Sequence, residues 1–173
     1  FRLAWVHFNL GQTKLAEREL VQLLQISTLE SSFREEAAHD LATFMGVNDI
    51  TDSSVATLTR LTPENSRQKN LVYLALELDR TAKKKSALKV WALLGGMNLS
   101  LEDQVERQIN ITRIEYDLHR HGQLLVEIDN SIKLLKSAPC RDNEECVVGN
   151  QDLRRIITDW AKAEERMPSR ALI

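Results

Sequence analysis

The chain has 173 residues, of which 43% are hydrophobic and 28% are charged, as in an ordinary globular protein rather than a disordered or membrane-spanning one. Lys and Arg total 23 against 25 Asp and Glu, so the net charge of −2 does not favour nucleic acid or an anionic membrane as a partner. Only six glycines and three prolines interrupt stretches rich in Leu, Ala, Glu, Lys, Gln and Arg, and this composition predicts an all-α fold.

Apolar residues that recur every three or four positions predict a series of helices. In chain order, the predicted helices span residues 1–10, 13–26, 30–45, 52–61, 63–81, 84–95, 101–121, 124–137 and 151–167. We expect Thr62 to cap the fifth helix with Pro63 as its first residue, and Ser100 with Asp103 resembles a capping box before the seventh. No Pro- or Gly-rich linker interrupts the pattern, so residues 1–173 are predicted to form one domain.

A small residue returns at a nearly constant interval along the chain. Gly46 lies 35 residues after Gly11, Ala82 lies 36 after Gly46, and Gly122 follows a further 40 residues on. Such an interval indicates repeated helical hairpins, in which a first helix ends near the small residue and a second helix packs back. Gly11, Gly46 and Gly122 are expected to adopt a left-handed backbone conformation just past the helix end.

Small side chains also mark the second helix of two hairpins. Ala16 and Ala87 each stand five residues after Gly11 and Ala82, where a small side chain lets two helices approach closely. Trp91 follows on the apolar stripe of the same predicted helix as Ala87 and is expected to pack inward.

These residues together resemble the tetratricopeptide repeat (TPR) family over about residues 1–139. The resemblance implies a right-handed α-solenoid of TPR-like helix-turn-helix repeats, with about four repeats and a C-terminal helix. Glu35 stands where the family has an aromatic residue, and Glu127 where it has a small one, so the second and fourth hairpins are expected to be splayed or irregular. The residues that carry the resemblance are Trp5, Gly11, Ala16, Leu20, Leu23, Leu71, Leu74, Ala75, Ala87, Trp91, Leu94, Ile111, Ile114, Leu118, Gly122 and Pro139.

A further likeness concerns location. The stretches LAWVHFNLG and REEAAHDLATF look like TPR proteins of the bacterial cell envelope. Cys140 and Cys146 enclose the polar stretch RDNEE, and we expect a disulfide between them, the alternative being two free thiols in a reducing cytosol. The prediction is therefore a periplasmic or envelope-associated protein, with a cytoplasmic one as the alternative.

No catalytic or metal-binding motif stands out. His119 and His121 are two residues apart, so on one helix they point in different directions and are expected to be exposed or to line a groove. The run from Lys83 to Lys85 is too short for a nucleic-acid patch. The sequence therefore predicts a protein that is not an enzyme and that has no metal and no cofactor.

The TPR resemblance implies a concave groove lined by the first helix of each hairpin. Aromatic and Arg side chains are the usual anchors of an interface. For Trp5 and Phe8 the alternative is packing against a further helix, because the chain opens FRLAW inside a helical pattern and is expected to be a fragment of a longer protein. The predicted groove comprises Trp5, Phe8, Asn9, Glu36, Asp40, Phe44, Lys69, Asp79, Arg80, Tyr116, His119 and Arg120.

Three functions remain open from the sequence. The leading one is an adaptor that holds a peptide or helix of another protein in the concave groove, without nucleic acid and without insertion into a membrane. The second is a structural segment of a longer solenoid that self-associates through its terminal helices, and the third is a helical domain that serves chemistry supplied elsewhere. Tyr116 and Arg120 are expected to form a surface pair, separate from the core-facing Ile111, Ile114 and Leu118.

Overall fold

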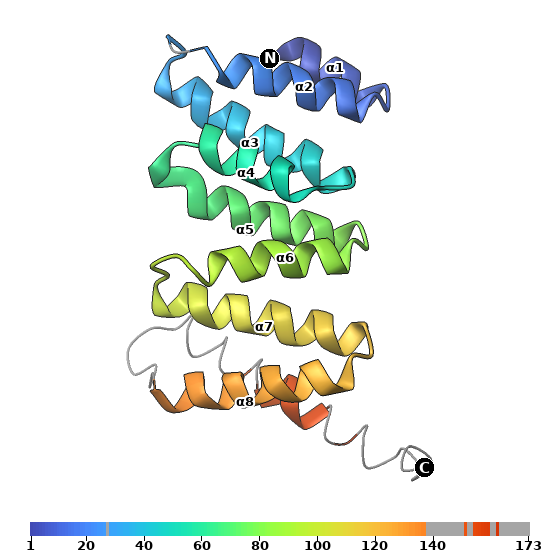
Figure 1. The fold of residues 1–173 in the computed structure, drawn as a ribbon, viewed down its shortest axis with the longest axis vertical. Coiled ribbons are helices and arrows are strands. Elements are labelled where there is room, and N and C mark those ends of the chain that lie inside the picture. Colours follow the sequence, from blue (N-terminus) through green and yellow to red (C-terminus); the bar gives the residue numbers. More distant parts are fainter. Residues whose placement is uncertain (27, 138–150, 152–153, 160–161, 163–173) are drawn as a thin grey trace. The chain divides into compact units, whose positions relative to one another are not determined.

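The computed structural model describes residues 1–26, 28–137, 151, 154–159 and 162, and its regular structure is entirely α-helical (Figure 1). These bounds confirm the all-α prediction, and each of the first eight predicted helices is found with ends within four residues of those expected. Of the predicted helix over residues 151–167, the described part includes a helical run over 154–159. The helices are α1 (Arg2–Asn9), α2 (Thr13–Leu24), α3 (Ser31–Val47), α4 (Asp52–Leu61), α5 (Glu64–Arg80), α6 (Lys84–Leu94), α7 (Leu101–Asp117) and α8 (His121–Ser137).

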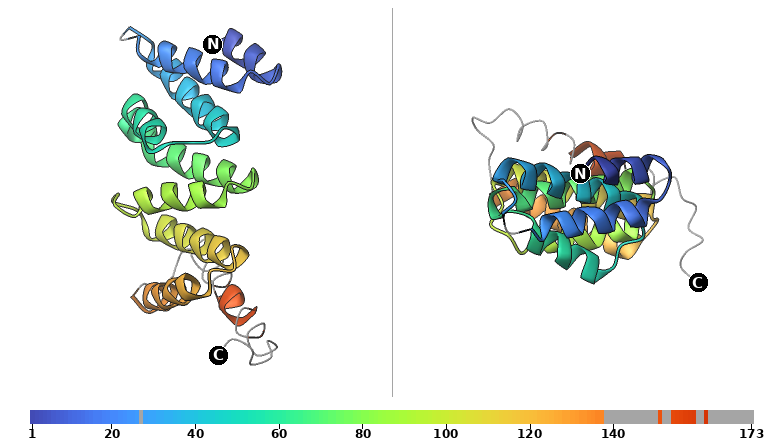
Figure 2. Two further views of the ribbon diagram at one scale, coloured as in Figure 1. Left: turned by 45° about the vertical axis from the view of Figure 1, so that its right-hand side comes forward. Right: turned by 90° about the horizontal axis from the view of Figure 1, so that it is seen from above.

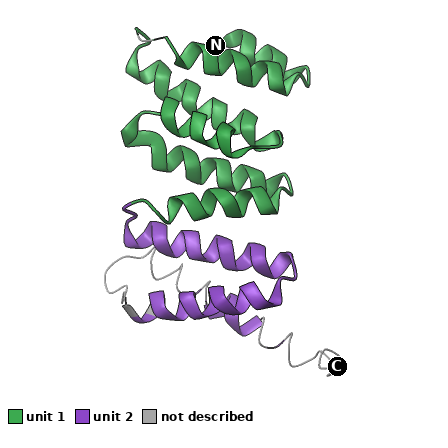
Figure 3. Ribbon diagram, in the orientation of Figure 1, with its two compact units in different colours: residues 1–97 green, residues 98–173 purple. Residues whose placement is uncertain are grey.

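The chain divides into two compact units, which are described separately (Figure 3). Unit 1 covers residues 1–97 and contains α1 to α6, whereas unit 2 covers residues 98–173 and contains α7 and α8. The boundary follows Gly95 and Gly96, a segment too short to stand out from the sequence as a linker. Within the described residues, no helix is both long enough and apolar enough to cross a lipid bilayer.

Three hairpins reverse the chain through the same turn. In the α1–α2, α5–α6 and α7–α8 hairpins, the second residue past the first helix is left-handed: Gly11 has φ 75°, Ala82 has φ 60° and His119 has φ 53°. The next backbone N–H then donates to a carbonyl five residues earlier, which is the bond that defines a Schellman motif. These bonds run from Gln12 to His7 (2.9 Å), from Lys83 to Leu78 (2.7 Å) and from Arg120 to Glu115 (3.2 Å).

The left-handed prediction is therefore confirmed for Gly11 and wrong for Gly46 and Gly122. Gly46 lies inside α3, where an added Cβ would come within 2.5 Å of Cβ of Glu77, so the missing side chain allows α3 and α5 to approach closely. Gly122 lies in the first turn of α8, where an added Cβ would meet nothing within 4 Å. His119 has the left-handed role instead.

The core of unit 1 is built from successive helix pairs. α1 packs on α2, α2 on α3, α3 on α5, and α5 on α6. Ala16, Ala87 and Trp91 are buried, which confirms that the second helices of two hairpins face inward at these positions. Arginines tie successive hairpins together: Arg34 donates to two carbonyls at the end of α2 (2.7 and 2.6 Å), and Arg67 donates to the carbonyl of Thr59 near the end of α4 (2.9 Å).

The α3–α4 hairpin is open, as predicted for the second hairpin. α4 makes far fewer contacts with α3 than the second helices of the other hairpins make with their partners, and it runs in a different direction from α3 (Figure 2). Asn48, after α3, is extended with ψ 161°, and its side chain is bonded to Thr13 and Glu17 of α2 (2.6 and 3.0 Å). Thr51 then starts α4 with a capping box. The chain leaves α3 extended, so α4 does not fold back along it.

The same prediction is wrong for the fourth hairpin, because α7 and α8 pack closely. The position five residues after the left-handed His119 is Leu124, which is buried, while Glu127 accepts hydrogen bonds from Gln108, Gln123 and Asn130. Glu127 is therefore not at the position that requires a small residue.

The predicted starts of the first seven helices are correct to within one residue, whereas α8 begins at His121 and not at the predicted residue 124. Ser100 accepts a bond from the backbone N–H of Asp103 (3.1 Å), which confirms it as the cap of α7. Pro63 is the residue before α5, not its first residue, and Thr62 ends α4 in an extended conformation. The prediction that Thr62 caps α5 is therefore wrong by one position.

Candidate functional site

The predicted aromatic residues of unit 1 gather in one cluster between α1 and α3. The ring centroids of Trp5 and Phe8 lie 5.6 Å apart, those of Trp5 and Phe44 lie 5.0 Å apart, and Phe8 stacks on Phe44 at 4.2 Å. Phe44 is fully buried, so its ring belongs to the core and does not line an open groove. Trp5 and Phe8 pack against α3, which supplies the partner that the alternative prediction assigned to an upstream helix.

Asp40 completes this cluster. The indole N–H of Trp5 donates to its carboxylate (2.5 Å), and Asp40 is buried. Burial raises the pKa of Asp40, while the Trp5 bond and the charge of His39 lower it and Glu36 raises it. The prediction that Asp40 offers an open contact is therefore corrected: its carboxylate holds α1 against α3.

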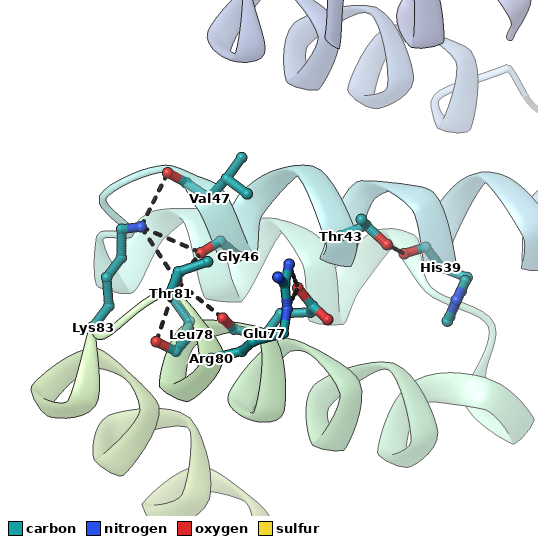
Figure 4. A network of polar contacts seen from close by, with 9 residues as sticks. All are labelled: His39, Thr43, Gly46, Val47, Glu77, Leu78, Arg80, Thr81 and Lys83. Atoms are coloured by element: carbon teal, nitrogen blue, oxygen red, sulfur yellow. Dashed lines mark hydrogen bonds and ion pairs between the residues drawn. The ribbon is translucent and has the colours of Figure 1, made fainter. Parts of the chain in front are cut away.

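The charged residues predicted on α5 are engaged within their own hairpin. The guanidinium of Arg80 pairs with Glu77 (2.6 Å), and the carboxylate of Asp79 pairs with Lys84 (3.2 Å). Beside the Arg80–Glu77 pair, Lys83 donates to the carbonyl of Val47 at the end of α3 (3.0 Å; Figure 4). These charges link α3, α5 and α6. Asn9, Glu36 and Lys69, which complete the predicted set in unit 1, are exposed.

The three predicted site residues of unit 2 have separate roles. Tyr116 is exposed and lines a cleft of 490 Å³ that also includes Arg155 and Asp159. His119 is the left-handed residue of the turn. Arg120 is exposed like Tyr116, as expected, but it lies beyond the end of α7 and pairs with the buried carboxylate of Glu115 (3.2 Å). Removing Arg120 would leave a buried charge without its cation.

A groove that the sequence did not predict lies between α4 and α6 in unit 1. It has a volume of 880 Å³ and a lining that is mostly apolar. Val55 is buried at its base, while Ala56, Ala92 and Leu93 are exposed, Leu93 by 54% of its surface. The lining residues are Ile50, Asp52, Val55, Ala56, Thr59, Arg60, Arg67, Lys89, Ala92 and Leu93. We call this set the α4–α6 groove.

The rim of the α4–α6 groove is basic. Arg60, Arg67 and Lys89 contribute three positive charges, and Asp52 contributes one negative charge. Lys89 pairs with Asp52 (3.2 Å), but both side chains are exposed, so the pair stabilises the protein little and exchanges readily with other charges. This local excess of positive charge contrasts with the net charge of −2 for the whole chain.

The sequence did not predict this groove, because the TPR resemblance implies a binding surface on the first helix of each hairpin, whereas α4 and α6 are second helices. The available signal was Glu35, whose departure from the TPR pattern predicted an open second hairpin. Along the open hairpin, the α4 side of the groove lining includes the exposed Asp52, Ala56 and Arg60. The exposed Leu93 on α6 completes an apolar surface that can bury side chains of a partner.

The described histidines have separate surroundings. His7 contacts Gln12 (2.6 Å) and Glu19 (3.5 Å), and His39 packs against the ring of Tyr73 with centroids 4.2 Å apart. Among the described residues, no group of three or more His, Cys, Asp or Glu could hold a metal ion. Cys140 and Cys146, predicted to form a disulfide, lie outside the described residues.

Comparisons with known proteins give no assignment for this chain. No family model, no curated protein and no solved structure matches it. The TPR resemblance therefore rests on the residues quoted from the sequence, and the function is argued from the geometry of the α4–α6 groove.

Proposed function

We propose that the chain is a helical-repeat module that binds another protein, with TPR-like hairpins as its scaffold and the α4–α6 groove as its contact surface. The left-handed residues Ala82 and His119 are 37 residues apart, which supports a repeat, and the TPR resemblance implies that the repeats form a right-handed solenoid. In this proposal the module acts as an adaptor and has no catalytic role of its own.

The observation that carries the proposal is an apolar groove of 880 Å³ bordered by charged side chains. Protein interfaces combine an apolar centre, from which charged residues are depleted, with a polar rim. The groove lining has both components, since it combines the apolar Ala56, Ala92 and Leu93 with the charged Arg60 and Lys89. The concave face of the first helices is a weaker candidate, because its predicted aromatic anchors pack against each other.

The experiment is affinity capture with two matched variants of the full chain. Leu93→Glu places a charge among the apolar lining residues of the groove, and Leu125→Glu places one at a leucine of α8 with similar exposure, 52% against 54%. We expect a protein that wild type and Leu125→Glu both retain and that Leu93→Glu loses by at least about tenfold, which is about 1.4 kcal/mol. Circular dichroism checks that both variants remain folded. Equal recovery with Leu93→Glu contradicts the proposal.

A second candidate function, self-association of a longer solenoid, is favoured by exposed apolar residues on α8. Leu125, Val126 and Ile132 are 52%, 51% and 38% exposed. If this face joins copies of the chain, sedimentation should show an oligomer that Leu125→Glu dissociates and Leu93→Glu leaves intact. A monomer at all concentrations excludes this second function and leaves the first untouched.

The envelope location is proposed on the sequence likeness and on the predicted Cys140–Cys146 disulfide. Intact mass of unreduced protein from a periplasmic preparation, with and without alkylation, tests the disulfide. Two alkylated thiols favour the cytoplasmic alternative.

A further inference from the structure

We propose that the occupant of the α4–α6 groove is an amphipathic helix whose apolar stripe is flanked by carboxylates. This inference rests on the proposed protein-binding function and specifies the chemistry of the partner. It follows from the walls of the groove, from the size of the side chains on them and from the charges on the rim.

The walls favour a helical occupant over an extended one. The two walls, α4 and α6, are helices, whose backbone groups form hydrogen bonds within the helix itself. The described residues contain no strand edge to which an extended peptide could add. Thr59 offers a hydroxyl in the lining, but that hydroxyl donates to the carbonyl of Val55 (2.9 Å). An extended peptide would bury N–H and C=O groups without partners, whereas a helix satisfies its own.

Side-chain size favours close approach of such a helix. Ala56 on α4 and Ala92 on α6 are both exposed and small, so they leave room for a helix to lie between the two walls. Ile50, Val55 and Leu93 then provide the larger apolar surfaces against which its anchors pack. Helix-in-groove recognition uses anchors three or four residues apart along one stripe.

The charge on the rim of the groove favours acidic side chains on both sides of the apolar stripe of the bound helix. Arg60, Arg67 and Lys89 exceed Asp52 by two positive charges, so carboxylates on either side of the apolar stripe meet cations, and ammonium groups meet like charges. Arg60 has no acidic partner among the described residues, and Lys89 can exchange its exposed Asp52 for a partner carboxylate.

The test uses designed peptides and the full chain. Three capped, fluorescein-labelled peptides of one length share the same Leu stripe: one has Glu at the flanking positions, one has Lys there, and one is the Glu peptide with two central prolines that prevent a helix. Fluorescence anisotropy measures binding at low and high salt. We expect the Glu peptide to bind at least about tenfold more tightly than either other peptide, and to weaken as salt rises.

Reversing the charge of two rim residues tests whether these residues determine which peptide binds. The double variant Arg60→Glu with Lys89→Glu should prefer the Lys peptide over the Glu peptide. The matched control is Lys14→Glu with Arg18→Glu, which changes the charge equally at exposed positions of α2 outside the groove lining. The control should retain the wild-type preference for the Glu peptide.

Four other outcomes of these binding experiments would contradict part of the proposal. Equal binding of the Glu and Lys peptides, or equal loss in the α2 control, overturns the charge argument. Equal binding of the proline peptide overturns the helical occupant. If no peptide binds while capture of a protein still depends on Leu93, the amphipathic helix is wrong and the protein-binding function stands. A lipid surface would replace the protein partner if the chain binds all three peptides equally and binds phosphatidylglycerol vesicles in a way that depends on Arg60 and Lys89.

Discussion

The α5–α6 hairpin of unit 1 and the α7–α8 hairpin of unit 2 reverse the chain through the same turn, yet different side chains fill the seam between their helices. In the first, Leu78, Ala87 and Trp91 are buried against each other's helices in an apolar seam. In the second, the apolar Ile114, Leu124 and Ile128 are joined by Gln108 and Ser131, which are buried within a set of hydrogen bonds. The same turn can therefore join two helices whether the side chains buried between them are all apolar or include a hydrogen-bonded polar set.

The polar seam of unit 2 is well satisfied. The amide of Gln108 donates to the carbonyl and carboxylate of Glu127 (3.0 and 3.1 Å), and Thr112 donates to the carbonyl of Gln108 (2.8 Å). Ser131 donates to the carbonyl of Glu127 (2.7 Å). Such a network fixes the register of two helices, but each of its bonds adds little net stability compared with burying a large apolar side chain.

The largest expected effect is therefore in the apolar seam. Trp91→Ala should lower the free energy of unfolding by about 3–5 kcal/mol, because it removes a buried aromatic side chain and leaves a cavity. Leu93→Ala, two residues further on the same helix, should change it by about 0.5 kcal/mol or less, since Leu93 is mostly exposed. Urea unfolding of both variants decides this, and similar losses would mean that the assigned inward face of α6 is wrong.

The polar seam should respond less. Gln108→Leu keeps the size of the side chain but removes the amide that donates to Glu127, so we expect a loss of about 1–3 kcal/mol in the free energy of unfolding. Gln104→Leu, one turn earlier on α7 and exposed, is the control and should cost about 0.5 kcal/mol or less. A neutral Gln108→Leu would show that the network contributes register and not stability.

The shared turn makes a smaller prediction that applies to both hairpins. Ala82→Gly and His119→Gly should each raise the free energy of unfolding by up to about 1 kcal/mol, because glycine adopts the left-handed conformation without a Cβ penalty. Gly11→Ala should lower it by about 1 kcal/mol through the backbone alone, since an added Cβ there meets nothing within 4 Å. Thermal unfolding of the three variants measures this. A destabilised Ala82→Gly would contradict the shared conformation.

Much of the fold could be predicted because helical periodicity is local. The positions of Ala16, Ala87 and Trp91 follow from the spacing of apolar and small residues, and all three are buried as expected. The turns were harder, because glycine serves both left-handed conformations and close helix contacts. Gly46 serves the second use, and the left-handed residue of the last turn is His119, which carries no glycine signal.

The candidate site could be predicted less well, because it depends on contacts distant in sequence. Aromatic residues at helical spacing look the same in a core and in a groove, and only the packing of Phe44 on Phe8 and Trp5 distinguishes the two. The α4–α6 groove depends on the direction of α4, which follows the extended Asn48. The side chain of Asn48 bonds to two residues of α2 that lie 35 and 31 positions earlier in the sequence. The composition of α4 alone does not show that direction.

The smallest expected effect concerns the residues at which the two turns differ most. The carbonyl that accepts the Schellman bond belongs to Leu78 in the α5–α6 hairpin and to Glu115 in the α7–α8 hairpin, and both side chains are buried. Burial raises the pKa of Glu115 above its ordinary value of 4.5, Arg120 opposes this, and the charge of Glu127 adds to it. The folded protein thus holds this proton more tightly than the unfolded chain does.

It follows that the contribution of Glu115 is most favourable below about pH 4.5 and is lost as the pH rises through the raised pKa of the folded state. Glu115→Gln, which cannot ionise, should gain stability relative to wild type between pH 4 and pH 7 in urea unfolding. Arg120→Ala should have the opposite effect and steepen the loss, because it removes the cation 3.2 Å from the carboxylate. If both variants unfold in parallel with wild type over this range, Glu115 is solvated in the folded protein, and the contrast between the two hairpins is confined to Gln108 and its partners.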